Sequence, residues 1–140
     1  MFERILLAVD GSEHALHAAQ KAAELARLLK PKELRIVVVY DTIPMYLGEP
    51  NMQMAITSRK GEAESILEKA VQAVGEVPCE VHTGIIEGSP AESIIEVANT
   101  RKSDLIVMGS RGLGRLAGLV LGSTSQKVVA HAPCPVLIVR

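Results

Sequence analysis

The sequence predicts a single α/β domain built on an open parallel sheet with helices on both faces. Short apolar runs alternate with helical patterns along the whole chain, in the order βαβαβαβαβ. Such alternation is typical of parallel sheets, because each strand needs a crossover helix to reach the next. The 140 residues, 48% of them hydrophobic, suit one compact domain over residues 1–140.

The five predicted strands are the apolar runs at residues 5–9, 34–40, 80–86, 105–108 and 136–139. Four of them are apolar throughout or, in the second, apart from Arg35, as expected of strands buried on both faces. The second is rich in valine, whose branched side chain favours strands. The third alternates apolar and polar side chains, so we expect a half-exposed strand at an edge of the sheet.

The first two helices are predicted from the spacing of apolar residues and from the residues that end them. Residues 13–29 repeat apolar side chains at helical spacing, including Leu16, and Pro31 follows the segment. A longer pattern begins near residue 56 and ends at Gly75. Both segments therefore predict crossover helices.

The last two helices are predicted from their first residues. Ser89 precedes Pro90 and Glu92, which indicates an N-cap, a proline in the first turn and a capping box. Ser123 and Gln126 have the same capping-box spacing before the last apolar run. We therefore expect Ser89 and Ser123 to be N-cap residues.

Composition argues against several classes of protein. A net charge of −1 and an aromatic content of 2% disfavour nucleic-acid binding. No apolar run reaches the roughly 18 residues of a membrane span, and the start of the chain does not resemble a signal peptide. Cys79 and Cys134 lie far apart without metal-ligand spacing, so we expect reduced thiols in a cytoplasmic protein.

The glycine-rich segment at residues 109–124 carries the functional prediction. It follows the end of a predicted strand and leads into a helix, where free N–H groups and the helix dipole favour phosphate. It lacks the Gly-Lys-Ser/Thr of a P-loop. A local match to the dinucleotide fingerprint, residues 112–117, follows the fourth strand and has no acidic residue downstream, so we treat it as coincidence. A flexible connection without a ligand is the alternative.

The spacing of Gly109, Gly112, Gly122 and Ser123 resembles the G-2x-G-9x-G(S/T) pattern of ATP-binding universal stress proteins. Residues 5–12, 104–112 and 133–139 resemble the first, fourth and closing strands of that family. The resemblance covers essentially the whole chain. It implies strand order 3-2-1-4-5, a Rossmann-like fold of the adenine nucleotide alpha hydrolase type, and a homodimer.

The resemblance also implies a nucleotide site for ATP, ADP or AMP. Asp10 would lie near the ribose or a phosphate-bound Mg²⁺, and Val39 would meet adenine through its backbone. Val9, Met108 and Arg111 would form walls. The phosphates would be held by Gly109, Gly112, Gly122, Ser123 and Thr124.

Several alternatives remain open at this stage. Asp10 could instead be the N-cap of the first helix, because Glu13 follows at capping-box spacing. The segment 41–54 could form a methionine-rich lid over the base or a simple connection; its candidate lid residues are Met45, Tyr46, Met52 and Met54. No histidine is visibly paired with a nucleophile.

Three functions follow from these observations. The first is a nucleotide-binding regulatory module for stress response, without catalytic residues. The second is a slow Mg²⁺-dependent ATPase, although a water-orienting base and a P-loop lysine are not evident. The third is a dimeric interaction protein, because the strand Val136–Val139 is wholly apolar at an expected sheet edge, and such edges favour association.

Overall fold

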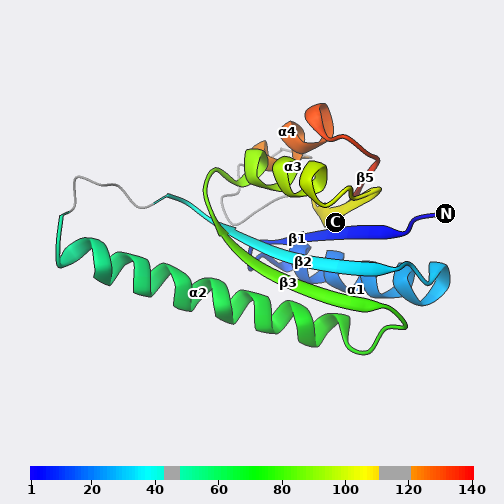
Figure 1. Ribbon diagram of the computed structural model, residues 1–140, viewed down its shortest axis with the longest axis horizontal. Coiled ribbons are helices and arrows are strands. Elements are labelled where there is room, and N and C mark those ends of the chain that lie inside the picture. Colours follow the sequence, from blue (N-terminus) through cyan, green and yellow to red (C-terminus); the bar gives the residue numbers. More distant parts are fainter. Residues whose placement is uncertain (43–47, 111–120) are drawn as a thin grey trace.

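The structure is a computed structural model that describes residues 1–42, 48–110 and 121–140 (Figure 1). Its elements alternate along the chain as the sequence predicts. They are β1 (Arg4–Val9), α1 (Glu13–Leu29), β2 (Glu33–Tyr40), α2 (Asn51–Val74), β3 (Glu80–Glu87), α3 (Pro90–Thr100), β4 (Leu105–Gly109), α4 (Ser123–His131) and β5 (Val136–Val139).

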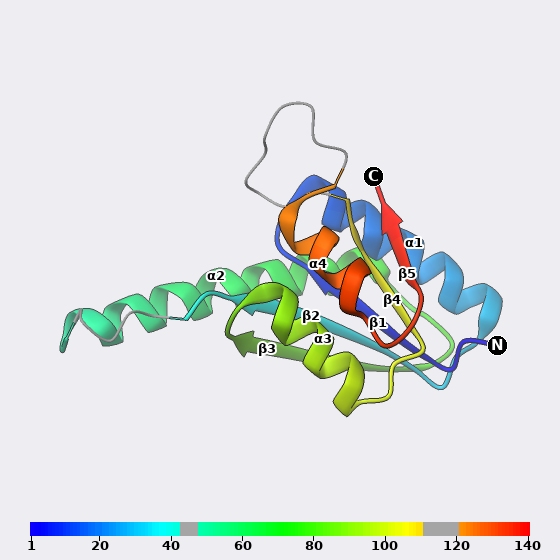
Figure 2. The same ribbon diagram turned by 90° about the horizontal axis from the view of Figure 1, so that it is seen from above.

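The strands form one parallel sheet in the order β3-β2-β1-β4-β5, which confirms the predicted fold class. Helices α1 and α2 cover one face, and α3 and α4 cover the other (Figures 1 and 2). The two edge strands are β3 and β5, and β3 is exposed over its first half, as its alternating sequence predicts. The apolar core therefore consists of two layers, one on each side of the sheet.

Strand β1 contributes to both layers, because successive side chains of a strand point to opposite faces. Ile5, Leu7 and Val9 pack toward α1 and α2, while Leu6 and Ala8 pack toward α3 and α4. All five are buried. A continuous apolar run is therefore what a strand at the centre of the sheet needs, because both of its faces are buried.

Helix α1 packs on the sheet through a face made almost entirely of alanine. Its buried residues are Ala15, Ala18, Ala19, Ala22, Ala23 and Ala26. Leu16, which the sequence pattern placed on this face, is 36% exposed instead. The small side chains leave room for the helix to lie close to β4, where Gly109 has no side chain either.

The start of α1 corrects one sequence alternative, because the N-cap is Ser12 and not Asp10. The Ser12 hydroxyl accepts a hydrogen bond from the Ala15 N–H at 3.2 Å. Asp10 instead accepts the Ser12 N–H at its Oδ1, 3.0 Å away. Since Ser12 itself has the extended backbone of a cap residue, Asp10 lies outside the helix and at the end of β1.

Neither predicted capping box forms. Ser89 is the N-cap residue of α3, with Pro90 after it, but its side chain makes no capping bond. In α4 the cap residue is Gly122, so Ser123 is already helical and that prediction is wrong. The cause is tertiary: the Gly122 N–H donates to the Ser110 carbonyl at 2.7 Å, which holds Gly122 outside the helix.

Helix α2 begins earlier than its apolar pattern predicts, at Asn51. Its first turns extend beyond the sheet in both views (Figures 1 and 2). Its last residue precedes Gly75, which has a φ of +65° and donates its N–H to the Val71 carbonyl. In the described part of the chain, we find no helix with the length and apolarity needed to cross a membrane.

Both cysteines are half-buried free thiols. Burial raises the pKa of Cys79 and of Cys134, and in Cys134 the nearby Asp104 carboxylate adds to the effect. A raised thiol pKa lowers the fraction of reactive thiolate. Cys79 packs against the core layer under α1 and α2, and Cys134 packs against the layer under α3 and α4.

Candidate functional site

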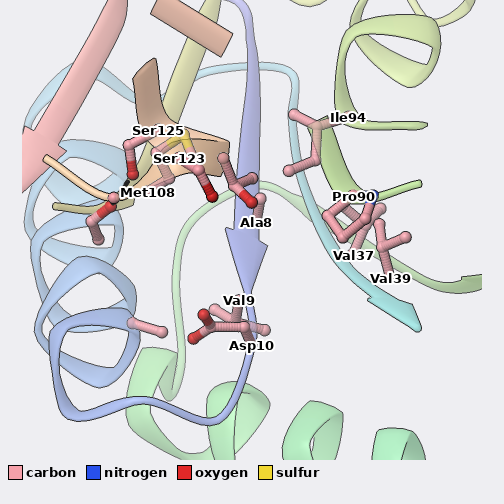
Figure 3. Close-up of a pocket in the computed structure, with 14 residues that line it drawn as sticks. Ala8, Val9, Asp10, Val37, Val39, Pro90, Ile94, Met108, Ser123 and Ser125 are labelled. Atoms are coloured by element: carbon pink, nitrogen blue, oxygen red, sulfur yellow. Dashed lines mark hydrogen bonds between the residues drawn. The ribbon is translucent and has the colours of Figure 1, made fainter. Parts of the chain in front are cut away.

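A pocket of about 240 Å³ opens at the carboxyl ends of the central strands (Figure 3). It lies where β1 has β2 on one side and β4 on the other. Open parallel sheets bind ligands at this point, because the two neighbouring crossovers leave in opposite directions. The residues that line it are Ala8, Val9, Asp10, Ala15, Val37, Val39, Pro90, Ile94, Met108, Gly109, Gly122, Ser123, Thr124 and Ser125.

One side of the pocket is apolar. Val37 and Val39 of β2 lie beside Pro90 and Ile94 of α3, and Ala8 of β1 lies between this side and the rest of the pocket (Figure 3). Val37 and Val39 share a face because they are two residues apart on a strand. No charged side chain belongs to this group, so it suits the flat apolar faces of an aromatic ring system.

The opposite side is polar and consists largely of backbone. Gly109 ends β4, and Gly122 to Ser125 form the start of α4. The first intrahelical bond runs from the Gln126 N–H to the Gly122 carbonyl, so the N–H groups of the preceding turn have no partner within the helix. Such a helix end favours an anion.

The hydroxyl groups at this helix start differ in their roles. Ser125 is buried and donates to the Gly109 carbonyl at 2.9 Å, which ties α4 to the end of β4. Among the described residues, the hydroxyls of Ser123 and Thr124 make no hydrogen bond. Both are therefore available to donate to a bound anion.

Asp10 supplies the only carboxylate among the described residues of the pocket wall. It is half-buried, and its Oδ1 accepts the Ser12 N–H. This bond fixes the orientation of the carboxylate at the end of β1. In the ranges that the structure describes, no three His, Cys, Asp or Glu side chains form a group that could hold a metal ion by themselves.

Gly109 is required by packing as well as by its position in the pocket. A Cβ atom there would lie 2.9 Å from the backbone carbon and the Cβ of His14, and 3.0 Å from the Ala15 nitrogen. Carbon atoms of real side chains do not approach backbone atoms so closely. The end of β4 therefore touches the first turn of α1 directly.

The structure brings together eight of the ten residues predicted to bind the nucleotide. Arg111 and Gly112 lie outside the described residues, as do Met45 and Tyr46 of the predicted lid. Met52 and Met54 belong to the first turn of α2 and do not line the pocket. The eight residues in the pocket wall are Val9, Asp10, Val39, Met108, Gly109, Gly122, Ser123 and Thr124.

Sequence reasoning missed most of the apolar side of the pocket. Ala8 and Val37 lie in apolar runs that fit a buried strand equally well, so their side chains gave no signal of a cavity. The period of two along β2 could have added Val37 once Val39 was proposed. Pro90 and Ile94 could have been found from their position at the start of a helix that follows a strand.

Sequence reasoning also missed a pair formed by a histidine and a serine. His14 Nδ1 lies 2.6 Å from the Ser110 hydroxyl oxygen, although 96 positions separate them. No local pattern in the sequence indicates this hydrogen bond, since neither residue is a defined position of a recognisable motif. The contact joins the first turn of α1 to the residue that follows β4.

Known proteins are similar to this chain along its whole length. A sequence model of the universal stress protein family matches residues 1–140. A universal stress protein of Thermus aquaticus is 49% identical over 140 residues, covering 100% of both chains. Universal stress protein MJ0531 of Methanocaldococcus jannaschii is 34% identical over 143 residues, covering 100% of this chain and 83% of the relative.

Solved structures agree with the sequence relatives. Universal stress protein UspA from Lactobacillus plantarum has a TM-score of 0.88 at 28% identity, over 99% of this chain and 98% of the other. A universal stress protein in complex with cAMP has a TM-score of 0.75 at 26% identity, over 99% and 97% of the two chains. The chain described here belongs to the universal stress protein family.

Proposed function

We propose that this protein binds an adenine nucleotide in the pocket beyond β1 and β4, and acts as a cytoplasmic regulatory module in the stress response. One observation carries the proposal: a single pocket has an apolar side and, opposite it, a helix N-terminus whose first-turn N–H groups have no partner within the helix and whose Ser123 and Thr124 hydroxyls make no hydrogen bond among the described residues. A nucleotide has the same two parts, an aromatic base and an anionic phosphate chain. The complex of a relative with cAMP supports this choice of ligand.

Each part of the nucleotide has a proposed partner. The base lies against Val39, the apolar side of the pocket and the wall formed by Val9 and Met108. The phosphates lie against Gly109 and Gly122 and meet the N–H groups of the turn that follows Gly122, which have no partner within α4. The remaining proposed phosphate donors are the Ser123 and Thr124 hydroxyls, together with Arg111 and Gly112 as the family resemblance implies.

Calorimetric titration of the full chain with ATP, ADP and AMP tests this proposal. We expect saturable binding of adenine nucleotides, with GTP as the control for base selectivity. Mass spectrometry of small molecules that copurify with the protein would show which nucleotide it holds. Absence of heat at millimolar ATP, ADP and AMP would contradict the proposal.

Asp10→Asn is expected to remove most of the effect of Mg²⁺ on ATP affinity. The proposed ATP complex has Mg²⁺ shared between the phosphates and the Asp10 carboxylate, a mode that this cation prefers over a cage made only of protein groups. Asparagine keeps an oxygen that can accept the Ser12 N–H, so the local backbone should persist. The measurement is ATP affinity with and without Mg²⁺.

The matched control is Asp41→Asn, an exposed carboxylate just beyond β2 that does not line the pocket. It should retain the Mg²⁺ effect of the natural protein. If Asp10→Asn also retains it, Asp10 is not a ligand of the cation.

We also propose that two copies pair through β5. This strand lies at the edge of the sheet, and its four apolar residues are only half-buried in the single chain. The Pro135 and Val139 carbonyls accept hydrogen bonds from β4 and Ser110. Because alternate residues of a strand bond to opposite sides, Ile138 should present its N–H to the free edge.

Light scattering at micromolar concentration is expected to give the mass of a dimer instead of the 15.0 kDa of one chain. Ile138→Pro removes the outward N–H and should give a monomer that still unfolds cooperatively. A monomeric natural protein would refute the pairing. A dimeric Ile138→Pro variant would place the interface elsewhere.

A further inference from the structure

We propose that His14 is a positioning residue for the phosphate side of the pocket, acting through its hydrogen bond to Ser110. Neither side chain lines the pocket. The proposal rests on nucleotide binding at this pocket and adds a determinant outside the pocket wall. It is carried by the contacts that meet at Ser110.

Ser110 connects three parts of the molecule and is only 2% exposed. Its N–H donates to the Val139 carbonyl of β5 at 2.8 Å, and its carbonyl accepts the Gly122 N–H at 2.7 Å. Its hydroxyl forms the 2.6 Å hydrogen bond with His14 Nδ1. Ser110 therefore fixes the spacing between the end of β4 and the start of α4.

The same contact links Asp10 with the polar side of the pocket. His14 lies in the first turn of α1, two residues after the Ser12 cap whose N–H orients Asp10. Gly109 contacts the backbone of His14, and Ser110 bonds to its ring. Asp10 on one side and Gly122 on the other are thus both held relative to the start of α1.

A serine hydrogen-bonded to a histidine is also the arrangement of an activated nucleophile. Two observations argue against that use. Ser110 does not line the pocket, and its low exposure keeps a substrate from its hydroxyl. In the described part of the chain, no carboxylate hydrogen-bonds to the His14 ring. The hydroxyl therefore serves to anchor the segment.

His14→Ala leaves the buried Ser110 hydroxyl without its partner, so we expect the Ser110 backbone to shift and Gly122 to move with it. The expected result is a roughly tenfold weaker ATP affinity, the size of effect that one lost hydrogen bond to a positioned group gives. His14→Asn should restore most of the affinity, since an asparagine amide can reach the position of Nδ1. Binding is measured by calorimetry on the full chain.

His17→Ala is the matched control, because His17 lies one turn further along α1 and its Nδ1 contacts the Arg140 carbonyl oxygen instead. Its ATP affinity should equal that of the natural protein. Ser110→Ala completes a double-mutant cycle with His14→Ala. If the two act through one hydrogen bond, the double variant should bind ATP about as weakly as either single variant.

A measurement without nucleotide separates this inference from the proposed function. By NMR, the Gly122 amide should exchange its hydrogen faster in His14→Ala than in the natural protein or in His17→Ala. If exchange is faster in His14→Ala but the natural protein does not bind ATP, the nucleotide proposal and the role of His14 in affinity are both overturned. The role of the His14–Ser110 hydrogen bond in anchoring Gly122 would then still stand. Unchanged exchange together with unchanged ATP affinity would overturn the anchor itself, and so would failure of His14→Asn to restore affinity.

Discussion

Replacing Gly109 by alanine is expected to lower the free energy of unfolding by about 1–3 kcal/mol and to weaken ATP binding together with it. The new methyl group would lie 2.9 Å from the backbone carbon and the Cβ of His14. These atoms belong to the first turn of α1 and cannot rotate aside, so α1 or β4 must move. Either movement displaces the polar side of the pocket, because Ser125 and Ser110 attach α4 to the end of β4.

Urea unfolding and calorimetry with ATP measure the two effects. Gly61→Ala provides the matched control, since no atom outside its own stretch of helix backbone lies within 4 Å of the position that its Cβ would take. It lies within α2, where alanine is favoured over glycine by roughly 0.5–1 kcal/mol, so that variant should be slightly more stable. A Gly109→Ala variant as stable as the natural protein would show that α1 can yield at this contact.

The class of the fold could be predicted from the sequence, but the order of its strands could not be predicted from local patterns. The alternation of apolar runs and helical patterns was enough to predict a parallel sheet, because parallel strands require crossovers. It could not give the order of the strands, which came from the resemblance of residues 5–12, 104–112 and 133–139 to one family. The order is a long-range property, since β1 pairs with β4 across about a hundred positions.

The helix ends are where local sequence patterns failed. At the start of α1, both Asp10 and Ser12 are residue types that suit an N-cap, and the local pattern cannot choose between them. At the start of α4, Ser123 has the spacing of a capping box, although Gly122 is the cap. The choice is made by contacts from elsewhere in the fold. At α4 it is the bond from Gly122 to Ser110, which leaves Ser123 in the helix with its hydroxyl unpaired.

The two sides of the candidate site were unequally predictable for a physical reason. Glycine, serine and aspartate at the ends of strands are unusual in a core, so their positions drew attention to phosphate chemistry. Ala8 and Val37 are ordinary core residues by type, and only the fold reveals that a cavity opens above them. The contact between His14 and Ser110 had no local signal, because it joins residues 96 positions apart.

Ala8→Leu is expected to reduce ATP affinity by at least roughly 10–200-fold. A change of one methylene in a hydrophobic pocket already has an effect of that size, and leucine adds more than one carbon. Ala8 pairs with Val37 on one side and Met108 on the other, both of them pocket residues. The neighbouring strands block sideways displacement, so the added carbons of leucine must enter the pocket where the base is proposed to lie. Unfolding by urea should change little, because the larger side chain fills space that is open in the natural protein.

The control for Ala8→Leu is Ala130→Leu, the same substitution on the exposed surface of α4. It should bind ATP as the natural protein does. Comparing Ala8→Leu with Gly109→Ala distinguishes the two halves of the ligand. Ala8→Leu should weaken the binding of adenosine as much as that of ATP, because it excludes the base. Gly109→Ala should weaken the binding of ATP more than that of adenosine, because it displaces the phosphate side of the pocket. Undiminished binding of both ligands by Ala8→Leu would place the nucleotide outside this pocket.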